Sequence, residues 1–309
     1  MNEKFRRKLL RIVKTIFSLL VISCIGLTIL YFYQKNDRIK LNNSEIKLYI
    51  NSTDTISEDK LQVNWQYLAA IDYVRYKKDL SKSTDESIQE LGKTFFKSNN
   101  SNNNFTLVSL DYILNELSFT KSQKEKTYKY IEQLTHIGLV PDNLKETSET
   151  KKFINELTPK AIEIYKKYKI LPSITISQAV LESSWGKSEL STKANNLFGI
   201  KADNSWKGKS VNMTTSEYYN KTIKDNFRSY DNINESLDDY GKFISDNKRY
   251  KESGVFNYSQ YIKQAQAIEN AGYSTIEDEK GNNIYADLIT NIIRENNLQL
   301  IDNKVQSEK

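Results

Sequence analysis

The chain contains an uncharged run, residues 15–33, that is long enough to cross a membrane as one helix. At about 1.5 Å per residue, its length roughly matches a hydrocarbon core of ~30 Å. The basic residues that precede it are Lys4, Arg6, Arg7, Lys8, Arg11 and Lys14. Because basic residues stay on the cytoplasmic side, we expect a cytoplasmic tip at residues 1–14. A single transmembrane anchor in the cell membrane would follow at 15–33, and the rest of the chain would be extracellular.

Two other interpretations fit the same run: a cleaved signal peptide, and a lipoprotein signal processed at Cys24. No small-x-small cleavage site follows the apolar residues, which argues against cleavage. The run continues for nine residues after Cys24, where a mature lipoprotein would turn polar. The retained anchor is therefore the favoured interpretation.

His136 and Cys24 are the only histidine and cysteine of the chain, and this excludes most hydrolytic chemistries. A zinc hydrolase usually needs two or more histidine ligands, and a Cys-His peptidase needs its cysteine outside the membrane. His136 follows a helical stretch, where a structural or surface role is expected. Carboxylate chemistry remains, and because it requires neither a metal nor an organic cofactor, we expect none.

The positive charge is concentrated at the N-terminus. Residues 1–40 hold nine Lys+Arg and two Asp+Glu, which leaves about −1 of the formal net charge of +6 for everything after them. No basic stripe lies outside the anchor, so binding of nucleic acid has no electrostatic support.

The chain after the anchor divides by composition. Residues 34–60 are polar and are expected to form a spacer. Residues 61–140 have apolar side chains at helical spacing, which predicts a small all-helical accessory domain. The polar stretch 141–150 is the expected boundary before a second domain at residues 150–302.

One carboxylate lies on an otherwise apolar helix of this second domain. Pro172 marks the start of the helix, and Glu182 borders its apolar face. Val180, Leu181 and Trp185 would desolvate Glu182 and raise its pKa, and a neutral carboxylic acid can donate a proton to a leaving glycosidic oxygen. The pattern therefore indicates a glycosidase, and the alternative is a surface glutamate paired with a nearby lysine.

The residues after this helix predict a β-hairpin. In a strand, every second side chain lies on the same face, and one face here would hold Val211, Met213, Thr215, Glu217 and Tyr219. Asn220 and Lys221 can form the turn, and the return strand would run toward Phe227–Tyr230. Helical spacing then resumes, so we expect a mainly α (α+β) chain in which a small hairpin lobe lies beside a helical lobe.

Five motifs follow one another in the second domain: Pro172–Ser188, Asn196–Lys201, Glu217-Tyr218, Phe227–Tyr230 and Ala271–Tyr273. In this order they resemble glycoside hydrolase family 73, and the resemblance covers about residues 150–302. It implies a lysozyme-like fold with a groove between the two lobes. It also implies an endo-β-N-acetylglucosaminidase, which cleaves the β-1,4 bond between N-acetylglucosamine and N-acetylmuramic acid in bacterial peptidoglycan.

The same resemblance implies roles for single residues. Glu182 would be the general acid, Glu217 the second carboxylate, and Tyr273 a groove hydroxyl that positions the acetamido group or a water, with core packing as its alternative role. Glu217 would activate water as a general base if it closes over the groove. If it stays too far away, the substrate's own 2-acetamido group would attack, and the stereochemical outcome stays open. The expected substrate-binding residues are Trp185, Asn196, Phe198 and Tyr230.

The loop after Tyr273 departs from the family pattern. Residues 274–286 are longer than the family's short connection, although Tyr285 and Ala286 recover the register before the last helix. Contacts from this loop are therefore not carried over.

Two other functions stay open. A lytic transglycosylase would use the same acid but let the 6-hydroxyl of muramic acid attack, giving 1,6-anhydro ends. An inactive glycan-binding or scaffold protein would use residues 61–140 to dock onto another membrane protein. In the favoured interpretation the partners are peptidoglycan strands, the membrane through residues 15–33, and a membrane protein through the helical domain.

Overall fold

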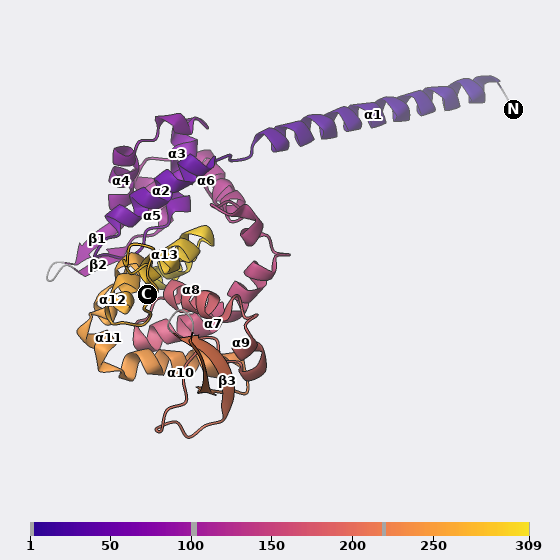
Figure 1. The fold of residues 1–309 in the computed structure, drawn as a ribbon. Coiled ribbons are helices and arrows are strands. Elements are labelled where there is room, and N and C mark those ends of the chain that lie inside the picture. Colours follow the sequence, from indigo (N-terminus) through magenta and orange to yellow (C-terminus); the bar gives the residue numbers. More distant parts are fainter. Residues whose placement is uncertain (1–2, 100–103, 218–220, 309) are drawn as a thin grey trace. The chain divides into compact units, whose positions relative to one another are not determined.

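The computed structural model describes residues 3–99, 104–217 and 221–308. The chain separates into two compact units, Met1–Lys40 and Leu41–Lys309 (Figure 1).

The first unit is the helix α1 (Glu3–Asn36) with the residues that flank it. Its segment Leu10–Thr28 has a mean hydropathy of 2.0 and is long and apolar enough to cross a membrane. A signal sequence near an N-terminus meets the same criterion, so membrane anchoring stays a prediction.

The second unit is mainly helical and contains two antiparallel hairpins. Its first half consists of α2 (Asn43–Ile56), α3 (Trp65–Arg75), η1 (Leu80–Lys82), α4 (Asp85–Lys93), β1 (Phe96–Asn99), β2 (Asn104–Leu107), α5 (Leu110–Glu116), α6 (Lys121–Leu134) and η2 (Pro141–Leu144). Its second half consists of α7 (Glu149–Tyr168), α8 (Pro172–Ser183), α9 (Glu189–Ala194), β3 (Ser210–Glu217), β4 (Lys221–Arg228), α10 (Ile233–Asp246), α11 (Lys248–Glu252), η4 (Val255–Asn257), α12 (Tyr261–Asn270), α13 (Tyr285–Glu295) and α14 (Gln299–Ser307).

Strands β3 and β4 form the hairpin that the sequence predicts. They pair antiparallel in a register that sets Glu217 opposite Lys221. Residues 218–220, which include the expected strand residue Tyr219 and turn residue Asn220, lie outside the described part of the structure. The expected mainly α class with a small β-hairpin is confirmed.

The expected spacer differs from what the structure contains, because most of it folds into α2. A capping box starts this helix: Asn42 accepts from the backbone N–H of Glu45 at 3.0 Å, and Glu45 accepts from that of Asn42 at 2.8 Å. Ile46, Tyr49 and Ile50 are buried at helical spacing. The high content of Asn, Ser and Thr concealed this apolar stripe in the sequence.

The segment expected to be all-helical also contains a hairpin, so that expectation needs correction. Strands β1 and β2 pair antiparallel, with Phe96 opposite Leu107. The rings of Phe96 and Phe105 meet edge to face at 5.8 Å, and the Lys60 ammonium lies 5.1 and 5.0 Å from their centres. Each strand has four residues, which is too short to produce a clear alternation in the sequence.

The core of the second unit surrounds α8. Every residue from Pro172 to Val180 is buried. Helices α7, α12, α13 and α14 pack against α8, and Figure 1 shows α7 next to it. Close packing on all sides holds a helix in one place, so the position of its last turn is well defined.

A carboxylate from α14 caps the N-terminus of α8. The N-cap residue Leu171 makes no side-chain capping bond. Instead, Asp302 Oδ1 accepts from the Ser173 backbone N–H at 2.9 Å, and Asp302 Oδ2 accepts from the Ser173 hydroxyl. Asp302 is fully buried, and this burial raises its pKa to about 7 although both bonds act in the opposite direction.

Asp54 links α2 to the helices near the C-terminus. Its carboxylate accepts from the Tyr261 hydroxyl at 2.6 Å and pairs with the Arg294 guanidinium at 2.8 Å, and Asp54 is only 4% exposed. The early and late helices therefore share one compact unit. A division into separate domains at residues 141–150 stays a prediction, and this stretch contains η2.

Replacing Asp54 with Ala should destabilise the protein by about 3 kcal/mol, because it leaves the half-buried Arg294 guanidinium without a carboxylate partner. Urea unfolding of the full-length protein in detergent measures this change. Lys263→Ala is the matched control, since Lys263 pairs with Glu58 on the surface and should cost less than about 1 kcal/mol. Equal stability of Asp54→Ala and wild type would mean that α2 does not hold the unit together.

Asp302 should make stability fall as the pH rises from about 4 to about 7. In this range the folded protein retains a proton that the unfolded carboxyl has lost. The free energy of unfolding therefore falls with pH by at most about 1.4 kcal/mol per pH unit. Asp302→Asn removes the titrating group, so its unfolding midpoint in urea should depend less on pH in this range. The same pH dependence in both proteins would contradict the raised pKa.

Candidate active site

Glu182 lies in the last turn of α8, next to a sharp left-handed turn. The helix ends one residue later, and Ser184, Trp185 and Gly186 have positive φ angles of 50°, 61° and 73°. Residues other than glycine rarely adopt this conformation, and such strain is typical of functional sites. The turn leaves Glu182 at the open end of a helix that is otherwise buried.

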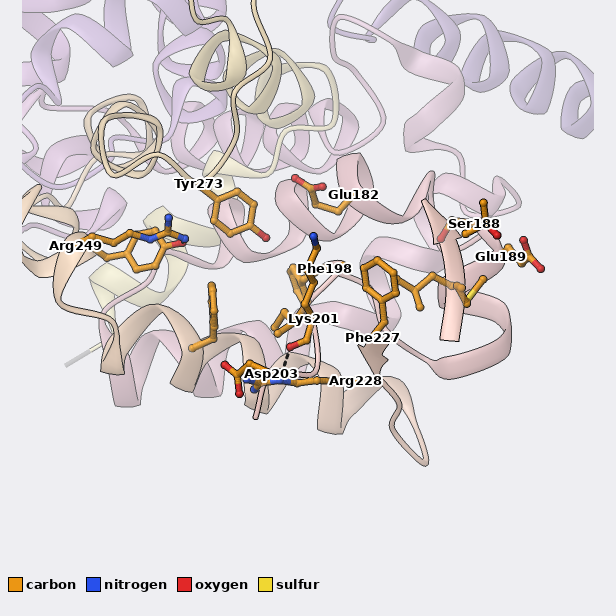
Figure 2. A pocket seen from close by; sticks show the side chains of 17 residues that line it. Glu182, Ser188, Glu189, Phe198, Lys201, Asp203, Phe227, Arg228, Arg249 and Tyr273 are labelled. Carbon is orange, nitrogen blue, oxygen red and sulfur yellow. Dashed lines mark hydrogen bonds between the residues drawn. The ribbon is translucent and has the colours of Figure 1, made fainter. Parts of the chain in front are cut away.

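The open end of α8 faces a cavity of 690 Å³, a size that suits a small ligand or a short stretch of a polymer. The rest of its wall comes from α9, the loop that follows it, β3, β4, α10, α11 and Tyr273. Figure 2 shows Glu182, Phe198 and Tyr273 at this cavity. The structure thus brings together three of the residues that the sequence predicts for the site.

A chain of hydrogen bonds runs from the core to Glu182. The Tyr240 hydroxyl donates to Gln178 Oε1, and Gln178 Nε2 donates to the Tyr285 hydroxyl oxygen at 2.9 Å. Tyr285 in turn donates to Glu182 Oε1 at 2.8 Å. Gln178, Tyr240 and Tyr285 are buried, so each must satisfy its polar atoms inside the protein. This relay fixes the orientation of the Glu182 carboxyl group.

Two opposing effects act on the pKa of Glu182. Burial by the surrounding protein atoms raises it, and the hydrogen bond from Tyr285 lowers it, with burial the larger effect. The side chain is nevertheless accessible from the cavity. Glu182 is therefore held toward its protonated form while it stays open to a ligand, as a general acid requires.

Tyr273 lies at the cavity beside Glu182 (Figure 2). Its ring stacks on that of Tyr285 with a centroid distance of 5.4 Å. Burial raises the pKa of Tyr273 well above its usual value, and the charge of Glu182 adds to this effect. The hydroxyl is therefore a neutral donor. Because the ring both packs in the protein and faces the cavity, a catalytic role for Tyr273 stays a prediction.

Glu217, the expected second carboxylate, ends strand β3. Its backbone pairs with Lys221, but its side chain lies outside the described part of the structure. Its role in the chemistry stays a prediction.

Phe198 and Asn196 lie on the loop between α9 and β3 and have different functions there. Phe198 lines the cavity, and its ring stacks on Tyr240 at 4.0 Å. Asn196 is buried and does not line the cavity. Its side-chain amide donates to the carbonyls of Ile200 and Arg228 and accepts from the backbone N–H of Ile200. Asn196 thus shapes the loop that presents Phe198.

Trp185 and Tyr230, two further predicted binding residues, also lie outside the cavity lining. Trp185 packs edge to face on Phe153 at 6.3 Å. The Tyr230 hydroxyl donates to Asp239 at 2.7 Å, and the residue is 6% exposed. In this structure both side chains contact residues outside the cavity lining, and their contact with a substrate stays a prediction.

The sequence interpretation missed three residues at or next to this site. Gln178 stands one turn before Glu182, and a polar residue at that place on an apolar helix was an available signal. In the sequence, Tyr285 marks only the place where the family pattern resumes after the long loop. Arg249 carried no signal, because only the packing of α11 brings it to the cavity.

Within residues 3–99, 104–217 and 221–308, no group of three or more His, Cys, Asp and Glu side chains has the arrangement to hold a metal ion.

Replacing Tyr285 with Phe should raise the pKa of Glu182 further, because a bond that favours the carboxylate is lost while burial remains. A ¹³C NMR titration of the glutamate carboxyl carbons measures this, with the Glu182 signal assigned by its absence in Glu182→Gln. Tyr261→Phe is the control, since it removes a buried hydroxyl that bonds Asp54 instead. An unchanged or lowered pKa in Tyr285→Phe would contradict the prediction.

Residues 158–298 match the glucosaminidase family, described as mannosyl-glycoprotein endo-beta-N-acetylglucosaminidase. The chain is 40% identical to the exo-glucosaminidase LytG of Bacillus subtilis over 166 residues, which cover 51% of this chain and 55% of LytG. It is 32% identical to the peptidoglycan hydrolase FlgJ of Escherichia coli (strain K12) over 175 residues, covering 54% and 53%. The chain therefore spans about half the length of these relatives.

Among solved structures, the chain is similar to the catalytic domain of the autolysin Auto from Listeria monocytogenes. The identity is 30% and the TM-score 0.44, covering 59% of this chain and 98% of that chain. The matched segment 158–298 contains α8, the β3–β4 hairpin, α11 and Tyr285. Through these residues the chain carries a domain of the glucosaminidase family, as its motifs indicated.

Proposed function

We propose that this domain is a peptidoglycan hydrolase that cleaves the β-1,4 bond between N-acetylglucosamine and N-acetylmuramic acid by general acid catalysis. The observation that carries the proposal is the state of Glu182. Its carboxyl group is held toward the protonated form, oriented by Tyr285 and open to the cavity. The names of two relatives, an exo-glucosaminidase and a peptidoglycan hydrolase, support the substrate class.

In the first step, Glu182 donates its proton to the glycosidic oxygen as the bond to the anomeric carbon breaks. The proton leaves with the departing sugar, and Glu182 becomes a carboxylate. The Tyr285 hydroxyl already points at this carboxylate, so it stabilises the charge without rearrangement.

Two routes complete the reaction, and each ends with water on the anomeric carbon. In the first, Glu217 takes a proton from the attacking water. In the second, the 2-acetamido oxygen attacks the anomeric carbon, and water then opens the cyclic intermediate while Glu182 recovers a proton. The neutral hydroxyl of Tyr273 suits either route, since it can orient the acetamido group or the water.

The apolar helix α1 supports a proposal for where this activity takes place. We place Leu10–Thr28 in the cell membrane, with the basic N-terminus in the cytoplasm and the glucosaminidase domain outside, near the wall. A membrane-protein partner for residues 61–140 is part of the same proposal. It is supported by the position of this segment between α1 and the glucosaminidase domain.

Glu182→Gln should lower the activity on purified peptidoglycan by at least about a hundredfold, because the amide cannot donate the proton. The full-length protein in detergent digests the wall, and the fragments are reduced with borohydride and analysed by mass spectrometry. The wild type should release reduced N-acetylglucosamine ends that the variant does not, with far-ultraviolet circular dichroism as the folding control.

Other products would replace the proposal with an alternative. Anhydro-muramic ends would identify a lytic transglycosylase, and no fragments from two folded proteins would favour the binding or scaffold function. The size of the fragments separates cleavage within strands from cleavage at their ends. Glu217→Gln separates the two routes. A loss of activity as large as that of Glu182→Gln supports Glu217 as the base, and a small loss of activity supports the acetamido route.

A further inference from the structure

Arg249 is a positively charged side chain fixed at the wall of the same cavity. It lies on α11 and lines the cavity together with Glu182 and Tyr273. Its Nη1 donates to the Gly272 carbonyl at 3.1 Å, and its Nη2 donates to the Tyr250 hydroxyl at 2.6 Å. The guanidinium also lies 4.7 Å from the centre of the Tyr250 ring. Tyr250 is fully buried, so the charge is attached to a rigid part of the core.

Arg249 differs from the other cations at the cavity in its partners. Lys201 pairs with Asp225 at 2.8 Å, and Arg228 pairs with Asp239 at 2.8 Å. Among the described side chains, no Asp or Glu forms an ion pair with Arg249, whose side chain is exposed. Its charge is therefore available to a ligand.

The geometry of the guanidinium suits one class of ligand group. Arginine has five N–H donors in a planar fork, and the bonds to Gly272 and Tyr250 leave the others for a ligand. Such a fork matches the two oxygens of a carboxylate, and the charge assists both bonds. Arg249 and Glu182 line the same cavity, and in the view of Figure 2 the Tyr273 ring lies between them, so a ligand that fills the cavity would contact both side chains.

A glycan strand of the proposed substrate carries carboxylates from two sources. N-acetylglucosamine is neutral, whereas the lactyl group of N-acetylmuramic acid ends in a free carboxylate when the peptide has been removed. When the peptide is present, that group is an amide, and the nearest carboxylates belong to the peptide. Both sources offer Arg249 the same chemistry.

We propose that Arg249 binds a carboxylate of the glycan strand and makes anionic strands better ligands than neutral ones. This inference rests on the proposed hydrolase function. It adds a determinant of specificity at the wall of the cavity, apart from the acid that breaks the bond.

Binding measured without turnover tests the proposal. The full-length Glu182→Gln protein in detergent is titrated by calorimetry with three soluble ligands: peptide-free strands, the same strands with methyl-esterified lactyl groups, and peptide-bearing strands. We expect carboxylate-bearing strands to bind about tenfold more tightly than the esters, the value of one charge-assisted bidentate contact. Adding Arg249→Gln should abolish this difference and leave the affinity for the esters unchanged.

Two further variants sharpen the test. Lys251→Gln removes a neighbouring exposed charge of α11 that does not line the cavity, so the tenfold difference should persist. Arg249→Lys keeps the charge but loses the fork, so it should retain only part of the difference.

Each outcome bears on the proposal. If Arg249→Gln lowers the affinity only for peptide-free strands, the bound group is the lactyl carboxylate. If it lowers the affinity only for peptide-bearing strands, the bound group is a peptide carboxylate. An equal loss for acids and esters in Arg249→Gln would show a structural role and overturn the proposal, as would no loss at all. A folded Glu182→Gln protein that binds none of the strands would overturn the hydrolase function and this inference with it.

Discussion

The burial of α8 is the constraint on which the site depends. Packing from α7, α12, α13 and α14 leaves no solvent along the helix from Pro172 to Val180, so each polar atom there needs a partner inside the protein. Gln178 meets this need with Tyr240 and Tyr285, and the last member of the relay is Glu182. The hydrogen bonds that pair the buried polar atoms of Gln178 therefore also orient the carboxyl group of Glu182 at the cavity.

The chemistry of Glu182 results from a balance between two opposite effects. Burial disfavours the carboxylate, whereas the Tyr285 hydroxyl favours it, and burial is the larger. An acid catalyst needs both, because it must hold a proton before the bond breaks and carry a charge afterwards. The left-handed turn at Ser184–Gly186 lets both effects act at one place, since it ends the helix where the buried network reaches the cavity.

Helix α13 connects this site with the N-terminal part of the second unit. Its first residue, Tyr285, bonds Glu182, and near its other end Arg294 pairs with Asp54 of α2. Arg294 lies nine positions after Tyr285, a rise of about 14 Å along the helix. The early helices thus contribute to the framework that holds a residue of the site in place, although the resemblance to the glucosaminidase family begins only near residue 150.

The sequence by itself determined the elements whose signals are local. These are the apolar N-terminal helix, the helix of Glu182 with its motifs, and the alternation of the β3–β4 hairpin. Helix α2 escaped prediction because its polar composition concealed the apolar stripe. The β1–β2 hairpin escaped prediction because strands of four residues are too short to show a clear alternation of apolar and polar side chains. Only the tertiary structure decided that Phe198 faces the cavity while Asn196 shapes its loop. It also decided that Tyr285 bonds Glu182 from the core and that Arg249 lines the cavity with Glu182. The reason is physical: periodicity records which side of a segment is buried, whereas a site is made by side chains from segments a hundred residues apart, and their meeting depends on how the whole core packs.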